Sequence, residues 1–262
     1  MRETLAALEA GEIGVKEAES RLAGYATTDA GRFDAARERR RGIPEAILAE
    51  GKTPAEVAAL ATTALDTTGR ALVTRADEAT AAAVASAVGG SAGSTADGDA
   101  DATVDRDHRT GTVVAHAAGF EPPSLDATVA VVAAGTADAP VAGEAAVVAR
   151  EVGATVDRVD DVGVANLDRI LDQVDRIREA DAVVVAAGRE GALPTVVAGL
   201  VDAPVIALPV STGYGVGGEG VAALEGALQS CSVLTTVNVD AGFVAGAQAG
   251  LIARAVDAAR AP

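Results

Sequence analysis

The second half of the chain alternates short apolar runs with longer alanine-rich stretches, and this alternation restricts the possible fold more than any other feature. The apolar runs predict five strands, at residues 128–135, 154–163, 182–188, 204–210 and 233–239. The intervening stretches predict helices at 140–153, 167–180, 218–230 and 241–259, and one more after the glycine turn at 188–191. Strands joined through helices run parallel with right-handed crossovers, and a sheet of such apolar strands is covered on both faces. The sequence therefore predicts an α/β fold with a doubly wound, mostly parallel sheet.

The chain is expected to contain three segments. Residues 1–53 predict an N-terminal helical region, 54–122 a small α/β domain and 123–262 the larger α/β domain. Pro122 and Pro123 mark the linker before the larger domain.

Local signals in the first half support this division. Residues 2–24 have apolar side chains at helical spacing and predict two short amphipathic helices. Thr53, Pro54 and Glu56 form a helix-start pattern, which predicts a helix from Pro54 to about Thr67. Further expectations are strands at 71–75 and 112–118, a helix at 77–90 and a solvated loop at 91–109.

The net charge excludes some classes of partner. With 38 acidic and 21 basic residues the net charge is −17, so nucleic acid and anionic membranes would be repelled. A surface this acidic suits a protein that works in concentrated salt, where screening removes self-repulsion. No leader sequence and no apolar run of about 20 residues is present, so a cytoplasmic location is expected.

Ligands of doubly wound sheets bind at the carboxyl ends of the strands. After the first strand of the larger domain, Gly135 and Thr136 precede a helix whose free N–H groups can hold a phosphate, although a simple tight turn is the alternative. Glu190 stands between Gly188 and Gly191, where it can take a proton from a substrate or merely cap the next helix.

Two further features are open to a structural or a functional reading. The glycine-rich loop 208–220, with Ser211, Thr212 and Tyr214, either fits against a flat or anionic ligand or is a flexible connector. Cys231, the only cysteine, begins the last apolar run and is either a small buried hydrophobe or a nucleophile.

The histidines do not suggest a metal centre. His116 reads as a core or interface residue, and His108 lies in the polar loop. Two histidines and one cysteine lack the ligand number and spacing of a zinc cluster.

Several motifs together resemble one family. The segment 188–249, beginning GREGALPTVV, is similar to the C-terminal domain of the LarB proteins of nickel-pincer nucleotide biosynthesis, which belong to the PurE superfamily of carboxyaminoimidazole ribonucleotide mutases. AAGTADAPVAGEAA (133–146), DVGVANLDR (161–169) and RFDAARERRRGIPEAILAEGKT (32–53) match other family segments. The likeness runs from Arg32 onward, apart from residues 91–108.

The resemblance implies a flavodoxin-like, PurE-like catalytic domain and a carboxylase. Its substrate would be nicotinic acid adenine dinucleotide, which gains a second ring carboxylate from carbon dioxide or bicarbonate. Hydrolysis of the phosphoanhydride would release AMP and pyridinium-3,5-biscarboxylic acid mononucleotide. Mg²⁺ recruited by acidic residues is expected to polarise the pyrophosphate. The resemblance implies no organic cofactor, and because the superfamily forms octamers it implies a homo-oligomer, up to an octamer.

By position, Cys231 matches the catalytic cysteine of the family and Glu190 its catalytic glutamate. The remaining candidates are residues expected to border the substrate. They are Gly135, Thr136 and Asp138 for the phosphates or ribose, Gly188, Arg189 and Gly191 beside the proposed base, and Ser211, Thr212, Gly213, Tyr214 and Gly215 for the ring or its carboxylate. Arg189 departs from the family, which commonly has methionine there. Arg37, Arg40, Arg41 and Lys52 fit either an adenylate contact or surface salt bridges.

Three alternatives remain. A PurE-type mutase is disfavoured because residues 160–169 lack the histidine of that subfamily and because Cys231 is present. A noncatalytic nucleotide-binding protein would keep the sheet and glycine loops without turnover. A dinucleotide-dependent oxidoreductase lacks its glycine fingerprint here.

Overall fold

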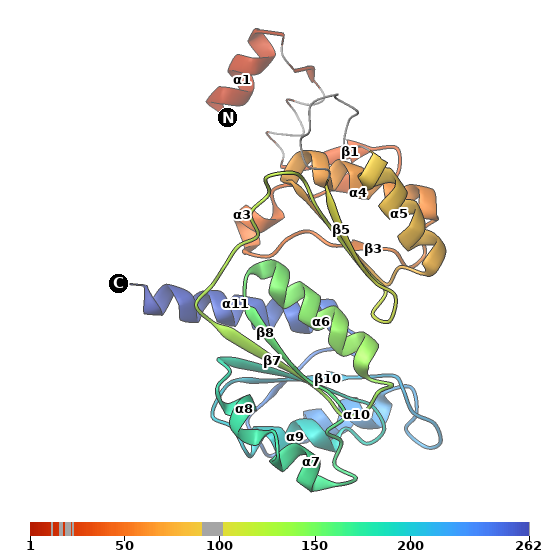
Figure 1. Cartoon of the computed structure of the whole chain (residues 1–262), viewed down its shortest axis with the longest axis vertical. Helices are drawn as coiled ribbons and strands as arrows, with labels where there is room; N and C mark the ends of the chain where they lie inside the picture. Colours follow the sequence, from red (N-terminus) through yellow and green to blue (C-terminus); the bar gives the residue numbers. More distant parts are fainter. Residues whose placement is uncertain (12, 16–17, 19–21, 23, 91–101, 262) are drawn as a thin grey trace. The chain divides into compact units, whose positions relative to one another are not determined.

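The computed structural model describes residues 1–11, 13–15, 18, 22, 24–90 and 102–261. The chain divides into two compact units, an N-terminal unit of Met1–Glu121 and a C-terminal unit of Pro122–Pro262 (Figure 1). The division falls at the proline pair where the sequence predicts a linker. Each unit has its own hydrophobic core.

The C-terminal unit is built on a five-stranded sheet in which every neighbouring pair is parallel. In the order β8-β7-β9-β10-β11, its strands are β7 (Thr128–Ala133), β8 (Thr155–Val159), β9 (Ala182–Ala187), β10 (Val205–Pro209) and β11 (Thr235–Thr236). This is the flavodoxin-like order, in which the direction of winding reverses between β7 and β9. The predicted doubly wound parallel sheet is confirmed, and the reversal marks the expected ligand crevice at the carboxyl ends of these strands.

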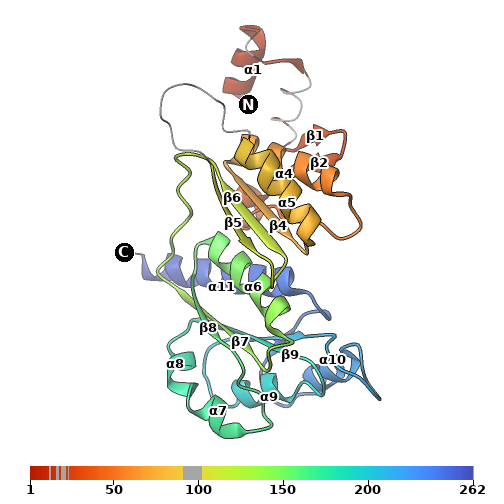
Figure 2. The same ribbon diagram turned by 45° about the vertical axis from the view of Figure 1, so that its right-hand side comes forward.

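Helices cover both faces of this sheet (Figures 1 and 2). They are α6 (Ala139–Val152), α7 (Leu167–Leu171), α8 (Val174–Arg178), α9 (Ala192–Ala198), α10 (Val221–Leu228) and α11 (Gly242–Arg260). Helices α6 and α11 share a core with Val129 and Val131, whereas α7, α8 and α9 share one with Val132 and Val183. Because successive strand residues point to opposite faces, the central strands are apolar throughout.

Helices α6 and α11 approach closely because α11 presents glycines at the contact. A Cβ atom placed on Gly242, Gly246 or Gly250 would lie 2.6, 2.3 or 2.8 Å from the nearest atom of α6. The sequence pattern of one glycine every fourth residue is therefore a packing requirement of this helix pair.

Several elements of the C-terminal unit are shorter than the sequence predicts, and two of these differences affect the account. The helix expected at 167–180 is divided into α7 and α8. The strand expected at 233–239 is reduced to Thr235–Thr236, so Cys231 lies in a bend before the strand and not at its start.

The N-terminal unit contains a two-stranded hairpin and a four-stranded mixed sheet. Its strands are β1 (Ala26–Thr28), β2 (Gly31–Phe33), β3 (Ile47–Leu48), β4 (Arg70–Thr74), β5 (Thr103–Asp107) and β6 (Thr112–His116), and its helices are α1 (Arg2–Glu9), α3 (Arg37–Arg41), α4 (Pro54–Thr68) and α5 (Glu78–Gly90). The hairpin is antiparallel, and the larger sheet has the order β3-β4-β6-β5, with β3 parallel to β4 and the other pairs antiparallel.

The first segment is less helical and less separate than predicted. It contains β1, β2 and β3, and its Phe33 and Ile47 belong to the same core as α4 and α5. Of the two helices predicted over residues 2–24, α1 is present, and much of the second lies outside the described residues.

Helix α4 begins as predicted. The hydroxyl of Thr53 accepts a hydrogen bond from the Glu56 N–H, and the Glu56 carboxylate accepts one from the Thr53 N–H at 2.8 Å. The hydrogen bond from the Thr53 backbone lowers the pKa of Glu56. This reciprocal pair is a capping box, and it holds the helix start.

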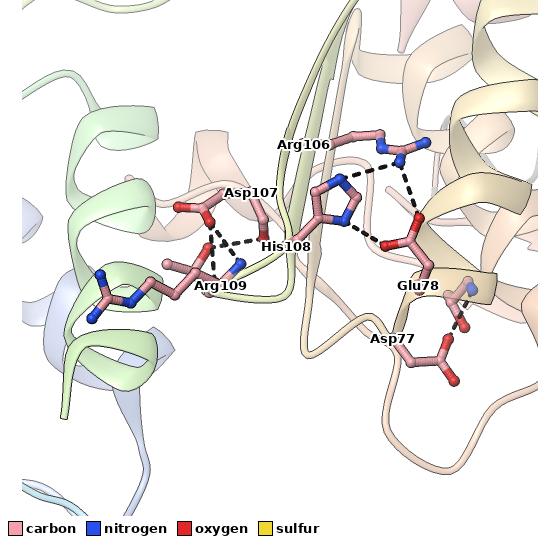
Figure 3. Close-up of polar contacts among 8 residues, drawn as sticks. Asp77, Glu78, Arg106, Asp107, His108 and Arg109 are labelled. Atoms are coloured by element: carbon pink, nitrogen blue, oxygen red, sulfur yellow. Dashed lines mark hydrogen bonds and ion pairs between the residues drawn. The ribbon is translucent and has the colours of Figure 1, made fainter. Parts of the chain in front are cut away.

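Residues 103–107 form strand β5, which corrects the prediction of a loop over 91–109; residues 91–101 lie outside the described part. After β5, the His108 ring lies between Glu78 and Arg106 (Figure 3). Its Nδ1 is 2.6 Å from a Glu78 carboxylate oxygen and its Nε2 is 3.3 Å from Arg106 Nη2. The exposed histidine thus belongs to a surface polar cluster.

Two of the four basic residues expected at an adenylate or in surface salt bridges, Arg37 and Arg40, form salt bridges. Arg37 pairs with Glu45 at 2.6 Å, and Arg40 pairs with Asp34. Lys52 donates to the Leu48 carbonyl at 2.7 Å.

None of the helices in the described part of the chain is long and apolar enough to cross a membrane.

Candidate active site

The carboxylate of Asp138 ties together the loops that follow three neighbouring strands. Its Oδ2 accepts the Gly135 N–H at 2.9 Å, after β7. Its Oδ1 accepts the Gly188 N–H at 3.1 Å, after β9, and the Thr212 hydroxyl at 2.7 Å, after β10. Asp138 is only 6% exposed, so these bonds are shielded from water. The crevice at the winding reversal is therefore built around one buried carboxylate.

Asp138 also affects the phosphate site that the sequence predicts at the start of α6. It occupies the N-cap of α6, and Pro140 in the first turn of that helix has no N–H to donate. This helix end has fewer free donors than its position suggests, and the roles of Gly135, Thr136 and Asp138 toward substrate stay predictions.

The glycines around Glu190 are required by contacts within the protein. A Cβ atom on Gly188 would lie 2.2 Å from the Thr212 carbonyl oxygen. Gly191 has a φ of +63°, and a Cβ there would lie 2.6 Å from the Cα of Ala223. Close packing of the loop after β9 against the loop after β10 and against α10 explains both glycines without a ligand.

The loop after β10 is folded into consecutive turns. Gly215 and Gly217 have positive φ angles of +82° and +75°, and the Ala222 N–H donates to the Gly217 carbonyl at 3.0 Å. Ser211 is anchored to the next loop because its N–H donates to Asp240 Oδ1 at 2.9 Å. The loop is thus a defined structure, not a loose connector.

Four of the predicted residues line one small pocket. Arg189, Glu190, Gly213 and Tyr214 meet residues 216–218, 220 and 222 around a cavity of about 180 Å³. Pockets that hold drug-sized ligands are roughly 300–1,000 Å³. This pocket is therefore of a size for one ring of a substrate rather than for a whole dinucleotide.

Glu190 and Cys231 are both open to solvent. Within the described residues, neither side chain has a hydrogen-bonding or ion-pairing partner. Glu190 follows β9, whereas Cys231 precedes β11 on the connection from α10. The reading of Cys231 as a buried structural thiol is excluded.

Contacts across α9 and α10 link the segments that carry these two residues. A Cβ atom on Gly226 of α10, five residues before Cys231, would lie 3.1 Å from the Glu190 carbonyl oxygen. The hydroxyl of Ser230 is 3.0 Å from the Thr195 hydroxyl, and the Ser232 hydroxyl donates to the Thr195 carbonyl at 3.3 Å.

Thr195 lies on α9, the helix that begins beside Glu190. The neighbours of Cys231 are thus fixed to the same helix, while the thiol itself faces solvent. Sequence reasoning missed Thr195, Ser230, Ser232 and Asp240, because their partners lie 29 or more residues away in the chain. No local motif signals such pairings.

No group of three or more His, Cys, Asp or Glu side chains in the described part of the chain is arranged to hold a metal ion. Mg²⁺ therefore stays an expectation for the substrate's phosphates, with no protein ligands assigned.

Comparison with known proteins gives concordant results for both units. Residues 25–111 match the family model of the LarB/PurE-like N-terminal domain, and residues 128–262 match that of AIR carboxylase. An uncharacterised protein of Methanocaldococcus jannaschii is 31% identical over 260 residues, which cover 97% of each chain. The chain therefore belongs to the LarB family of the PurE-like superfamily, whose domains are of the carboxylase type.

Proposed function

We propose that this protein carboxylates the pyridinium ring of nicotinic acid adenine dinucleotide and hydrolyses its phosphoanhydride. The products are pyridinium-3,5-biscarboxylic acid mononucleotide and AMP. The observation that carries the proposal is the exposed, unpartnered thiol of Cys231, whose serine neighbours are bonded to the helix that starts beside Glu190.

A nucleophile is needed because the substrate ring and carbon dioxide are both electrophiles. The thiolate of Cys231 adds to carbon 4 or carbon 6, forming a C–S bond and placing the electron pair of the broken π bond on the ring nitrogen. The ring becomes a neutral enamine, so carbon 5 is nucleophilic and forms a bond to carbon dioxide. A thiolate suits this step because it is a strong nucleophile that also leaves readily.

A base is needed to restore the ring. After carboxylation, carbon 5 carries both a hydrogen and the new carboxylate, and the ring nitrogen is again an iminium. Glu190 removes that proton, which returns the electron pair to the ring as an enamine. Expulsion of the Cys231 thiolate then regenerates the aromatic pyridinium. Exposure of the Glu190 carboxylate at the pocket supports this role, because no side chain in the described part of the chain is bonded to it.

The phosphoanhydride step needs only water as co-reactant. Water attacks phosphorus and the P–O bond to the other phosphate breaks, which yields two monophosphates. The residues that orient this water are not assigned.

The test is product identification. Purified protein is incubated with nicotinic acid adenine dinucleotide and ¹³C-bicarbonate at high salt with Mg²⁺, and the products are analysed by mass spectrometry. A labelled mononucleotide that appears together with AMP is the expected result. Unchanged dinucleotide, together with conversion of carboxyaminoimidazole ribonucleotide in a parallel assay, would instead identify a mutase of the purine pathway.

A further inference from the structure

The side chain of Arg189 is held against an aromatic ring at the mouth of the pocket that contains Glu190. Its guanidinium carbon lies 4.3 Å from the centroid of the Tyr214 ring, and its Nη2 donates to the Tyr214 hydroxyl at 3.1 Å. Stacking on an aromatic face and a hydrogen bond together restrict the orientation of the guanidinium.

The backbone beneath Arg189 is held as well. Arg189 has a φ of +50°, in the left-handed region that non-glycine residues rarely adopt. Its N–H donates to the Thr212 carbonyl at 3.1 Å, and Thr212 is in turn bonded to buried Asp138. A strained residue fixed by its surroundings is typical of functional sites.

Arg189 has no carboxylate partner within the described part of the chain, although the protein has a net charge of −17. A guanidinium has five N–H donors, and Tyr214 takes one of them. The remaining fork can bind both oxygens of a planar anion in a bidentate manner.

From this arrangement we infer that Arg189 binds the carboxylate that the substrate ring carries before reaction, and so selects the acid over the amide. The inference rests on the proposed function and names the residue that recognises its substrate class. A pyridinium carboxylate has one positive and one negative group. In this binding mode Arg189 meets the negative group, and the carboxylate of Glu190 attracts the cationic ring; both residues line the same pocket.

This pairing of charges also favours a ring carboxylate over a phosphate. A phosphate dianion in the pocket would be repelled by the Glu190 carboxylate, whereas the zwitterionic ring as a whole is neutral. The cavity of about 180 Å³ agrees with a single ring.

The test compares two ligands that differ only in this group. Nicotinic acid mononucleotide and nicotinamide mononucleotide are titrated into the full-length protein by calorimetry, in bicarbonate-free buffer. Neither ligand has a phosphoanhydride to hydrolyse. We expect the wild type to prefer the acid by about tenfold or more, the size of charge-assisted hydrogen bonds.

Arg189→Met should reduce this preference to within about twofold, because only the binding of the acid becomes weaker. Arg189→Lys keeps the charge but not the forked set of donors, so its preference should lie between those of the wild type and Arg189→Met. Arg254→Met is the matched control, because Arg254 is exposed on α11 of the same unit and does not line the pocket. It should retain the wild-type preference.

A preference that survives in Arg189→Met, or a wild type that binds both ligands equally, would overturn the inference. An Arg189→Met variant whose only defect is a raised KM for bicarbonate would also overturn the inference. Turnover of the dinucleotide by the wild type is measured separately, so a failure of the proposed function is distinguishable from a failure of this inference.

Discussion

At the scale of single residues, Asp138 and Glu190 are two carboxylates of the C-terminal unit that have opposite environments. Asp138 is 6% exposed and accepts hydrogen bonds from Gly135, Gly188 and Thr212. Glu190, two residues after Gly188, is exposed and lines the pocket. A carboxylate that accepts several hydrogen bonds from the protein holds its neighbours in place. A carboxylate without such bonds is available to a proton of the substrate.

Replacing Glu190 by Gln should abolish proton removal while keeping the size of the side chain. General-base contributions are typically about 10²–10⁴-fold, so kcat should fall by that order. Dinucleotide affinity should fall much less, because binding loses only the attraction between Glu190 and the cationic ring. Steady-state kinetics measure this, with Glu225→Gln, an exposed carboxylate on α10, as the control that should stay active. Equal activity in the two variants would show that Glu190 is not the general base.

Asp138→Asn should destabilise the C-terminal unit, since an amide nitrogen facing the Gly135 N–H replaces an acceptor with a donor. An unsatisfied buried group costs about 1–3 kcal/mol. Denaturant unfolding should show a loss of that size, and hydrogen exchange at Gly135 and Gly188 should accelerate. Asp202→Asn, at an exposed loop position, should leave both unchanged, and a stable Asp138→Asn would contradict the positioning role.

The residue types of the candidate site could be proposed from the sequence, but their geometry could not. Glu190, Arg189 and the glycine loops follow predicted strands, where ligands of such sheets bind, and Cys231 is singled out by the family resemblance. The burial of Asp138 and the serine contacts of the Cys231 segment depend on residues distant in sequence, so no local pattern encodes them.

At the scale of elements, the sequence predictions fail at two edge strands, β5 and β11, although the edge strand β8 is predicted. Strand β5 alternates exposed and half-buried residues and pairs on one side only, so its polar sequence resembles a loop. Strand β11 is also an edge strand, and its flanking Val233 is 94% exposed, so a β-branched run there does not extend the ladder. The central strands, buried on both faces, are predicted correctly.

The α6–α11 contact gives a prediction in which two effects oppose each other. Alanine is favoured over glycine inside a helix by about 1 kcal/mol. In Gly246→Ala, however, the new Cβ would meet three backbone atoms of Ala145 at 2.3–2.9 Å, and backbone cannot rotate away as a side chain can. Overpacking costs roughly 1–3 kcal/mol.

We therefore expect Gly246→Ala to lower the free energy of unfolding in spite of its better helix propensity. Gln248→Ala, at an exposed position of α11, should be neutral or slightly stabilising. Urea unfolding of both variants decides this, and a stabilised Gly246→Ala would show that the helices are less closely packed than described.

At the scale of the whole C-terminal unit, Asp181 joins the first and last elements. Its Oδ2 accepts the Thr128 N–H at 2.8 Å, and its Oδ1 lies 2.6 Å from Nη2 of Arg260 at the end of α11. Burial by itself would raise the pKa of Asp181, but the hydrogen bonds from Thr128 and Arg260 and the charge of Arg260 outweigh it and lower the pKa.

A carboxyl whose pKa is lowered by folding stabilises the folded state above its unfolded pKa of about 3.9. That contribution disappears as the pH falls through the lower, folded pKa. The difference in unfolding free energy between wild type and Asp181→Asn should therefore be constant above about pH 5 and shrink in more acidic solution. A difference that grows on acidification would reverse the assigned sign.

The organisation of the whole chain was largely predictable, because a proline-marked linker and a long strand–helix alternation are strong signals. The N-terminal unit was predicted less well: β1, β2 and β3 are two or three residues long, too short for a periodic pattern to form.

The most direct test of the central claim is a single-turnover measurement of ¹³C-bicarbonate incorporation by the wild type and by Cys231→Ser, with dinucleotide binding measured on both. The wild type is predicted to label the mononucleotide. Cys231→Ser should bind the dinucleotide as tightly but incorporate label at least about 10³-fold more slowly. Comparable labelling by the serine variant would show that ring carboxylation does not pass through this sulfur.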